Sequence, residues 1–308
     1  MRTNGSWFCS IALTLGLSAA AVTSAQDQIP VLDQTEKVDF DRTEAWAMQF
    51  FGSVAMFTPL CAPVVREPGS VDVAVEVTQV PHLSADQRRV GFDGVKEEDL
   101  NRLPVFVRPR VTVGLPHRFA IEVGWVPPIE IDGVQPNIFS LALDRVLYVG
   151  QNWSFGARLH GQIGSVEGDL VCSEEDASFA PGTPENSYGC QAPSNDETTL
   201  DHVALHLGAG YQVKSARGPT FLFGAGAIHH DLEFQVDAFT YSVHDRTRLL
   251  ADGTTWALDA GMSIPASDRT QLGIELLWSP LEVVRPPETT PQNDDLFHVK
   301  ALVRYRVR

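Results

Sequence analysis

The sequence predicts an all-β fold, a transmembrane antiparallel up-and-down β-barrel of about ten strands. Apolar and polar residues alternate strictly in ten segments of roughly nine to thirteen residues. This is the pattern of β-strands whose two faces lie in different surroundings. The connections between the segments are short and long in turn. Strands of this length, with tight turns at one end and long loops at the other, are typical of a barrel that spans a membrane.

The first 25 residues are predicted to be a signal peptide for export. Arg2 supplies a positive charge, Ile11–Val22 is a short apolar run, and the small residues Thr23–Ala25 form a cleavage site. The run is shorter than the ~20 residues that a membrane helix needs, so residues 1–25 are expected to be removed. About 283 residues then remain, which is enough for one large β domain.

Residues 26–70 are predicted to be an N-terminal segment that lies in the periplasm or plugs the barrel. Asp41 followed by Glu44 is typical of a helix start. The apolar run that follows, AWAMQFFGSVAMF, suits a short helix or two strands. We favour the helix. A hairpin at this position would instead raise the barrel to twelve strands.

Residues 71–308 are predicted to form the barrel. In NWSFGARLHGQI, for example, Trp153 and Phe155 share one face of a strand, and Arg158 and His160 share the other. A soluble β-sandwich has similar strand spacing but no reason to sort its loops by end. The strands are predicted at 71–80, 104–115, 117–126, 138–147, 152–164, 201–213, 219–229, 253–264, 270–279 and 297–307. Long loops are predicted at 81–103, 127–137, 165–200, 230–252 and 280–296.

The last strand, FHVKALVRYRVR, carries a resemblance to a known class of proteins. Its apolar residues occupy alternate positions and include Val303, Tyr305 and Val307. This resembles the terminal strand of outer-membrane β-barrel proteins of Gram-negative bacteria, with Val307 where those proteins commonly have an aromatic residue and Arg308 beyond it. The resemblance implies that these three residues are an assembly signal read by the outer-membrane assembly machinery. It also implies a location in the outer membrane, among its lipid and lipopolysaccharide.

The polar faces of the strands are predicted to line the lumen. Closure of the barrel brings the basic last strand beside the acidic first strand, so Asp72 and Glu76 are expected to pair with Lys300, Arg304 or Arg306. Balanced positive and negative charge favours a mostly closed interior over a pore. The predicted lumen polar network consists of Asp72, Glu76, Arg110, Glu122, Asp144, Arg158, His160, His206, Asp259, Glu275, Lys300, Arg304 and Arg306.

One long loop is predicted to contain a disulfide. Cys172 and Cys190 lie in the acidic loop 165–200, and an exported chain can oxidise them. Cys61 is expected to stay single. His202 and His206 share one face of a strand but are roughly 13 Å apart along it, so we predict no metal site. No cofactor is predicted either.

The sequence leaves the function open among three classes. With 39 acidic and 23 basic residues, it excludes a nucleic-acid-binding role. The common hydrolase and phosphate-binding motifs are missing from it. His230-Asp231 and His244-Asp245 are similar to the His-Asp pairs of the omptin proteases, but no matching pair of aspartates is found, so no catalytic residue is predicted. We favour a structural or surface-contact barrel with a mostly closed lumen; the alternatives are a small-solute channel or transporter and an outer-membrane surface hydrolase.

Overall fold

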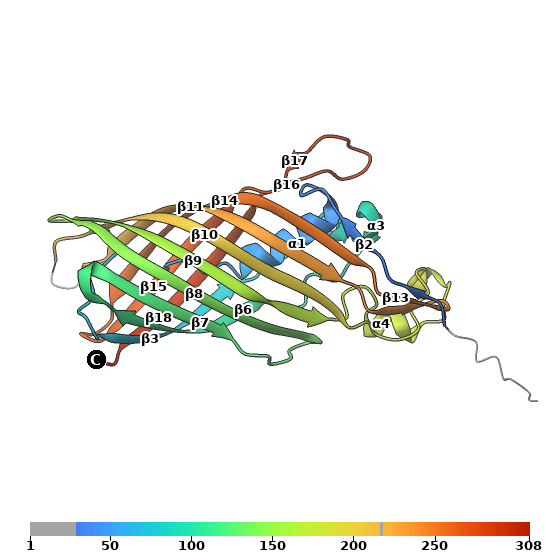
Figure 1. Cartoon of the computed structure of the whole chain (residues 1–308), viewed down its shortest axis with the longest axis horizontal. Coiled ribbons are helices and arrows are strands. Elements are labelled where there is room, and N and C mark those ends of the chain that lie inside the picture. The colour runs from blue at the N-terminus through green and yellow to red at the C-terminus, as the bar shows by residue number, and fades with distance from the viewer. Residues whose placement is uncertain (1–28, 216–217) are drawn as a thin grey trace, which may run out of the picture.

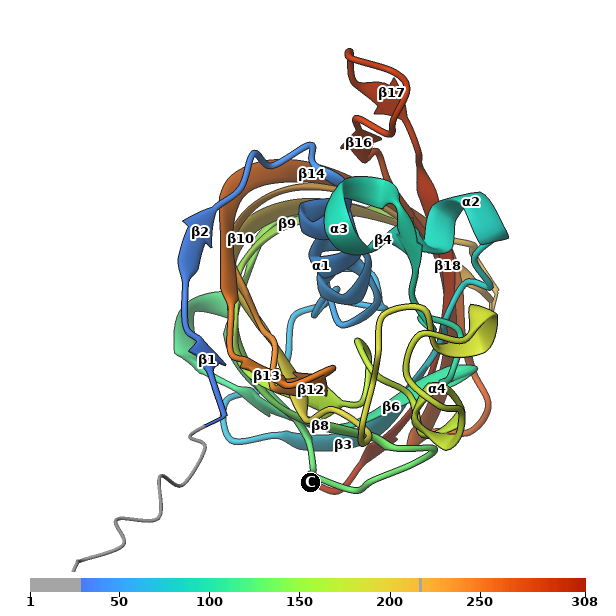
Figure 2. The same ribbon diagram turned by 90° about the vertical axis from the view of Figure 1, so that its right-hand side faces the viewer.

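Ten antiparallel strands close into one barrel (Figures 1 and 2). The computed structural model describes residues 29–215 and 218–308, so the expected signal peptide lies outside the described residues. The strands follow one another around the wall in chain order, and the last pairs with the first. The predicted fold class and the number of ten strands are therefore confirmed. The barrel strands are β3 (Val71–Gln79), β6 (Val105–Gly114), β7 (Phe119–Val126), β8 (Val134–Val149), β9 (Trp153–Gly168), β10 (Asp196–Gln212), β11 (Thr220–Gln235), β14 (Arg248–Pro265), β15 (Thr270–Ser279) and β18 (Leu296–Arg306).

Five neighbouring strands are longer than the alternation predicts. β8, β9 and β11 have 16 residues, β10 has 17 and β14 has 18. Most of the extra residues lie at the end with the longer connections, which we call the loop end; the end with the four short turns is the turn end. At the loop end the outward positions are polar, as at Asp201, Asp231 and Asp252, which are paired across β10, β11 and β14. Apolar alternation therefore stops there although the backbone pairing continues.

The outer face of the barrel is an apolar band with aromatic residues near both margins. Trp125, Trp256 and Phe297 are exposed near the loop-end limit of this band. Trp153 and Tyr305 are exposed near the turn-end limit. Such an arrangement places the amphipathic rings at the two interfaces of a bilayer and the aliphatic side chains in its interior. Within the two described stretches of the chain, no helix is long and apolar enough to cross a membrane.

Short elements fill the connections at the loop end, where they form a cap. The only element in a turn-end connection of the described chain is the 3-10 helix η1 (Pro116–Arg118). The loop-end elements are α2 (Ala85–Arg88), β4 (Arg89–Val90), α3 (Gly91–Gly94), β5 (Lys96–Glu97), α4 (Glu174–Ser178), η2 (Pro184–Asn186), β12 (Ala238–Thr240), β13 (Val243–Asp245), β16 (Glu282–Val283) and β17 (Gln292–Asn293).

The N-terminal segment starts at the loop end and passes through the barrel. β1 (Val31–Leu32) pairs with β13, and β2 (Thr35–Lys37) pairs with the loop end of β14. The helix α1 (Thr43–Val54) then lies inside the barrel (Figure 2). The chain continues through the lumen to the turn end, where β3 begins (Figure 1). We call residues 43–66 the plug.

A helix forms in the plug, so the hairpin alternative with twelve strands is not realised in the described chain. The expected capping pattern is not formed, because the helix follows Arg42 and this residue makes no side-chain cap. Glu44 instead accepts hydrogen bonds from Arg42 Nε at 2.8 Å and from the backbone N–H of Asp93 at 2.7 Å. The first turn of α1 is thereby attached to the loop that contains α3.

The loop-end half of the lumen is an apolar core around α1. Trp46 and Phe50 are fully buried and stacked, with ring centroids 6.2 Å apart. They belong to one cluster with Ile138 and Leu200 of the wall and Leu100 of the cap. Burying each such large side chain contributes about 1.5–3 kcal/mol. The apolar half of the plug is therefore held by packing, whereas the half that follows α1 lies among charged residues.

Candidate functional site in the barrel lumen

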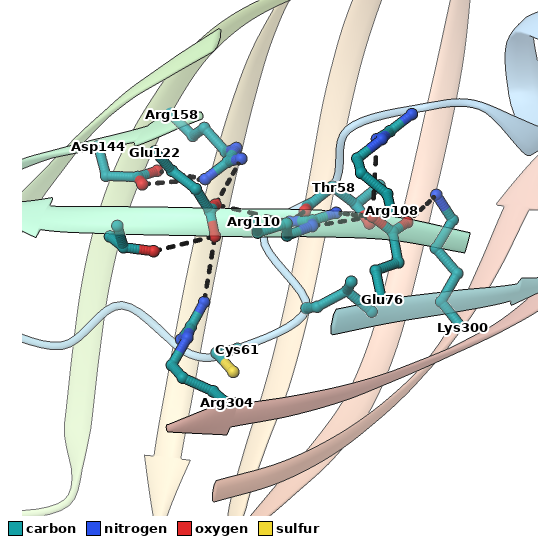
Figure 3. Close-up of polar contacts among 12 residues, drawn as sticks. Thr58, Cys61, Glu76, Arg108, Arg110, Glu122, Asp144, Arg158, Lys300 and Arg304 are labelled. Carbon is teal, nitrogen blue, oxygen red and sulfur yellow. Dashed lines mark hydrogen bonds and ion pairs between the residues drawn. The ribbon is translucent and has the colours of Figure 1, made fainter. Parts of the chain in front are cut away.

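Three wall cations lie around Glu76 (Figure 3) and bind backbone carbonyl groups of the plug just after α1. Arg108 Nη2 donates a hydrogen bond to the carbonyl of Ala55. Lys300 Nζ donates to the carbonyl of Met56 at 2.5 Å, and Arg110 Nη1 donates to that of Thr58 at 2.8 Å. The last turn of a helix leaves its carbonyl groups without helical partners, and here cations satisfy carbonyls at and just beyond that end.

A carboxylate of β15 holds the same stretch of the plug. The Thr58 hydroxyl donates to Glu275 Oε1 at 2.6 Å, and the backbone N–H of Leu60 donates to Oε2 at 3.2 Å. Leu60 has a φ of 56°, in the left-handed region that few non-glycine residues adopt. The two hydrogen bonds that Glu275 accepts hold the chain where this turn occurs.

Two further buried carboxylates organise the cations. Glu76 lies 2.5 Å from Arg110 Nη2, 3.5 Å from Lys300 Nζ and 3.6 Å from Arg108 Nη1. All four side chains are fully buried. The Lys300–Glu76 pair joins β18 to β3, and so does an ion pair between Arg306 and Asp72 at 3.6 Å. The closing seam of the barrel therefore contains two ion pairs.

The second carboxylate, Glu122, lies nearer the turn end. Its oxygens are 2.8 Å from Arg158 Nη2, 3.3 Å from Arg304 Nη2 and 3.5 Å from Arg110 Nη1. The Thr112 hydroxyl also donates to it at 3.1 Å. Arg158 has a second partner, Asp144 at 2.9 Å.

The plug residue Phe57 lies between the two clusters. Its ring centroid is 4.2 Å from the guanidinium carbon of Arg110, 4.6 Å from that of Arg158 and 5.2 Å from that of Arg108. Cations over an aromatic face are attracted to it, more strongly where water is excluded. The alternation of the strands carries no information about this contact, because Phe57 lies outside the strands.

Histidines form a separate group on the lumen face. His206 Nε2 is 2.5 Å from Asp259 Oδ1. The rings of His160 and His202 are 5.5 Å apart, and those of His202 and His230 are 5.8 Å apart. In the described residues, no group of three or more His, Cys, Asp or Glu side chains is arranged to hold a metal ion.

Neither His-Asp sequence pair forms a dyad between its own two residues. His230 is buried in the lumen, whereas Asp231 is exposed on the opposite face of β11. His244 Nε2 contacts Asp237 at 2.5 Å. Adjacent residues of a strand point to opposite faces, which is why these sequence pairs do not become structural pairs.

The thirteen residues predicted for the lumen network all lie on the inner side of the wall, to different depths. Asp144 is partly exposed, with 29% of its side-chain surface accessible, and Arg306 is 60% exposed at the turn-end rim. The other eleven are buried. Reasoning from the strands did not identify Thr58, Phe57 or Arg66, since these belong to the plug. Of the proposed assembly signal, Val303 and Tyr305 lie on the outer face of β18, and Val307 follows its end.

The cap at the loop end is held by a second, smaller polar group. Lys96 Nζ donates to Glu98 Oε2 at 2.5 Å and to the carbonyl of Val171, which joins the first long loop to the third. Burial raises the pKa of Glu98 to about 7, although Lys96 opposes this shift. In the third loop, the predicted disulfide between Cys172 and Cys190 is confirmed, with Cα atoms 5.6 Å apart. Cys61 is a free cysteine buried in the lumen.

The sequence matches no protein-family model and no curated protein. Its structural neighbours are outer-membrane β-barrel proteins of Gram-negative bacteria. The outer-membrane protease OmpT from Escherichia coli is 9% identical, with a TM-score of 0.33 over 77% of this chain and 94% of that chain. The attachment invasion locus protein Ail of Yersinia pestis is 10% identical, with a TM-score of 0.28 over 78% and 98%. The translocator domain of the autotransporter NalP from Neisseria meningitidis is 10% identical, with a TM-score of 0.36 over 77% and 87%. At these values the likeness concerns the fold alone.

Proposed function

We propose that the protein is an outer-membrane barrel closed by its own plug, and that it acts by contact through its loop-end surface. The observation that carries this proposal is the set of bonds between the wall and the plug. Arg108, Arg110 and Lys300 bind three plug carbonyl groups, and Glu275 binds the same stretch from β15.

Opening the barrel would require these bonds to break together. Removal of the plug would leave the three cations and Glu275 without their backbone partners in a confined interior. Each lost hydrogen bond to a charged group costs about 1.5–3 kcal/mol. The apolar packing of α1 would be lost as well. A plug attached in this way is a structural part of the barrel and not a loosely held gate.

The loop end is the surface that we assign to the outside of the cell. Long loops face outward in outer-membrane barrels, and a disulfide suits an exported segment. The five loop-end connections contain eighteen Asp and Glu against six Lys and Arg, whereas the four turns contain one Asp against four Lys and Arg. The presented surface is thus acidic, and it would contact lipopolysaccharide through divalent cations or meet a basic partner directly.

Single-channel recording in planar bilayers tests the closed state. The refolded mature chain should show no stable conductance. A variant that lacks residues 29–66 and still shows the heat-modifiable band of a folded barrel on a gel should conduct. Arg246→Gln, a change in the loop-end cap, is the control and should stay silent. Stable conductance on the nanosiemens scale from the unaltered chain would contradict the proposal.

A small-solute channel is the second candidate, and cavities on both sides of the lumen favour it. One cavity lies toward the turn end and contacts Arg158 and Arg304. A mainly apolar one lies between α1 and the wall and contacts Leu103 and Phe106. The plug segment bonded to Lys300 and Glu275 separates them. Solute uptake by vesicles that contain the unaltered chain would support this candidate over the first.

A further inference from the structure

The turn end of the lumen opens into a polar vestibule. It consists of a small cavity beside Glu122 and a wider one at the mouth of the barrel. Arg66 of the plug and Arg304 of β18 line both cavities and therefore lie where the two meet.

Arg304 has donors that the protein does not use. Its Nη2 lies 3.3 Å from Glu122, but Nε and Nη1 are buried and have no hydrogen-bond partner in the described chain. Its side chain is only 5% exposed. A buried guanidinium group with two unused N–H directions is costly unless another acceptor is bound.

The charges on the inner side of the barrel, taken together, are positive by one. Glu122 is shared by Arg110, Arg158 and Arg304. The wall residues alone balance six bases against six acids, and Arg66, which pairs with Asp72 at 3.3 Å, is a seventh base. The bases are Arg66, Arg108, Arg110, Arg158, Lys300, Arg304 and Arg306, and the acids are Asp72, Glu76, Glu122, Asp144, Asp259 and Glu275. In a chain of net charge −16, this local surplus is the opposite of the average.

We propose that the vestibule binds a phosphate group between Arg304 and Arg66. The unused N–H groups of Arg304 are charged donors, and phosphate oxygens accept strong hydrogen bonds from such donors. Hydroxyl groups of Ser154, Thr220 and Ser267 line the wider cavity and provide further donors. A tetrahedral anion suits donors that approach from several sides of the barrel. This proposal does not rest on the contact function proposed above.

The phosphate group has two possible sources. One is free inorganic phosphate that enters through the open mouth. The other is the headgroup of an anionic phospholipid from the leaflet around the turn end, reaching the rim near Arg306, which is 60% exposed. Both offer the same oxygens to Arg304, so the experiment must distinguish them.

Isothermal titration calorimetry with inorganic phosphate tests the free source, on the full mature chain in nanodiscs of phosphatidylcholine alone and at low ionic strength. Chloride serves as the reference anion. Phosphate should bind, and Arg304→Gln should weaken binding about tenfold or more, as expected for the loss of a charge-assisted hydrogen bond. Arg248→Gln at the loop end is the matched control and should leave binding unchanged.

Native mass spectrometry tests the lipid source, on protein in nanodiscs that also contain phosphatidylglycerol. Retained phosphatidylglycerol that is lost in Arg304→Gln but kept in Arg248→Gln would support the lipid headgroup. The proposal is overturned if phosphate does not bind and no lipid is retained, or if either ligand is bound equally by Arg304→Gln. If Arg304→Gln does not refold, Arg66→Gln, which changes the other proposed phosphate ligand, decides in its place, and unchanged binding there overturns the proposal.

Discussion

Single buried carboxylates determine how the lumen is held together. Glu76 neutralises part of the charge of three cations, and all three, Arg108, Arg110 and Lys300, also bind the plug. A change at this one carboxylate therefore affects the wall, the seam and the plug together. Breaking a buried ion pair by removing one partner costs about 3–5 kcal/mol, whereas exposed pairs contribute about 0–1 kcal/mol.

The change Glu76→Gln should consequently destabilise the folded barrel by several kcal/mol. The amide keeps the shape of the side chain but leaves Arg108, Arg110 and Lys300 without their shared anion. Equilibrium urea unfolding of protein refolded into lipid vesicles measures the loss. Glu97→Gln is the matched control, since the Glu97–Arg88 pair is half-exposed and its loss should cost less than about 1 kcal/mol. Equal effects of the two changes would contradict a central role for Glu76.

At the scale of the elements, the strands could be predicted from the sequence and the plug contacts could not. Lipid outside and polar residues inside impose a period of two, and this period marks all ten strands. It fails at Asp201, Asp231 and Asp252, where the wall is polar outside, so the predicted strands stop short of the loop end. The wall cations bind the plug through the carbonyl groups of Ala55, Met56 and Thr58. Every residue has a backbone carbonyl group, so these contacts leave no pattern in the sequence. Only the apolar run of α1 indicated a buried helix.

The first long loop should be sensitive to pH through Glu98. Its folded pKa of about 7 lies above the ordinary value of 4.5, so the folded loop binds the proton more tightly than the unfolded loop does. Stability of the cap is greatest below about pH 4.5 and falls as the pH rises to about 7, by at most about 3 kcal/mol. Hydrogen exchange of residues 89–100, corrected for intrinsic rates, should show less protection at pH 8 than at pH 5. Glu98→Gln, which stays neutral, should remove this difference, and an unchanged difference would assign it to another group.

The disulfide of the third long loop should stabilise the loop and not the barrel. Closing a loop of this size contributes about 3 kcal/mol in the chain-entropy description, but the loop can open while the strands stay paired. Reduction should expose residues 173–189 to protease and leave the unfolding temperature of the barrel nearly unchanged. The double variant Cys172→Ser/Cys190→Ser should behave like the reduced protein, and Cys61→Ser should behave like the unaltered chain. A large fall in barrel stability on reduction would show that the loop supports the wall.

At the scale of the whole molecule, the two ends of the barrel differ in charge and in how far the chain closes them. The loop end is acidic and capped, and the turn end is basic and open to the vestibule. The sequence indicated acidic loops and a balanced lumen, but not the excess of positive charge, because Arg66 reaches the vestibule from the plug. The alternation of the sequence predicts which side chains of the wall face the lumen. It does not predict the position of Arg66, which depends on the path of the plug through the lumen.

That path makes a prediction about the N-terminus. Residues 29–37 run along the loop end, where β1 pairs with β13 and β2 pairs with β14. Lys37 also forms an ion pair with Asp252 on the outside of the wall. If the loop end faces outward, the segment that begins at Ile29 lies at the cell surface even though the first barrel strand begins at the turn end. A short epitope inserted before Ile29 should therefore bind antibody on intact cells, as should an epitope in the third long loop after Gly182.

An epitope in the turn at residues 150–152 should become accessible only after the outer membrane is permeabilised. Binding of antibody to the turn but not to the N-terminal epitope on intact cells would mean that the barrel has the opposite orientation.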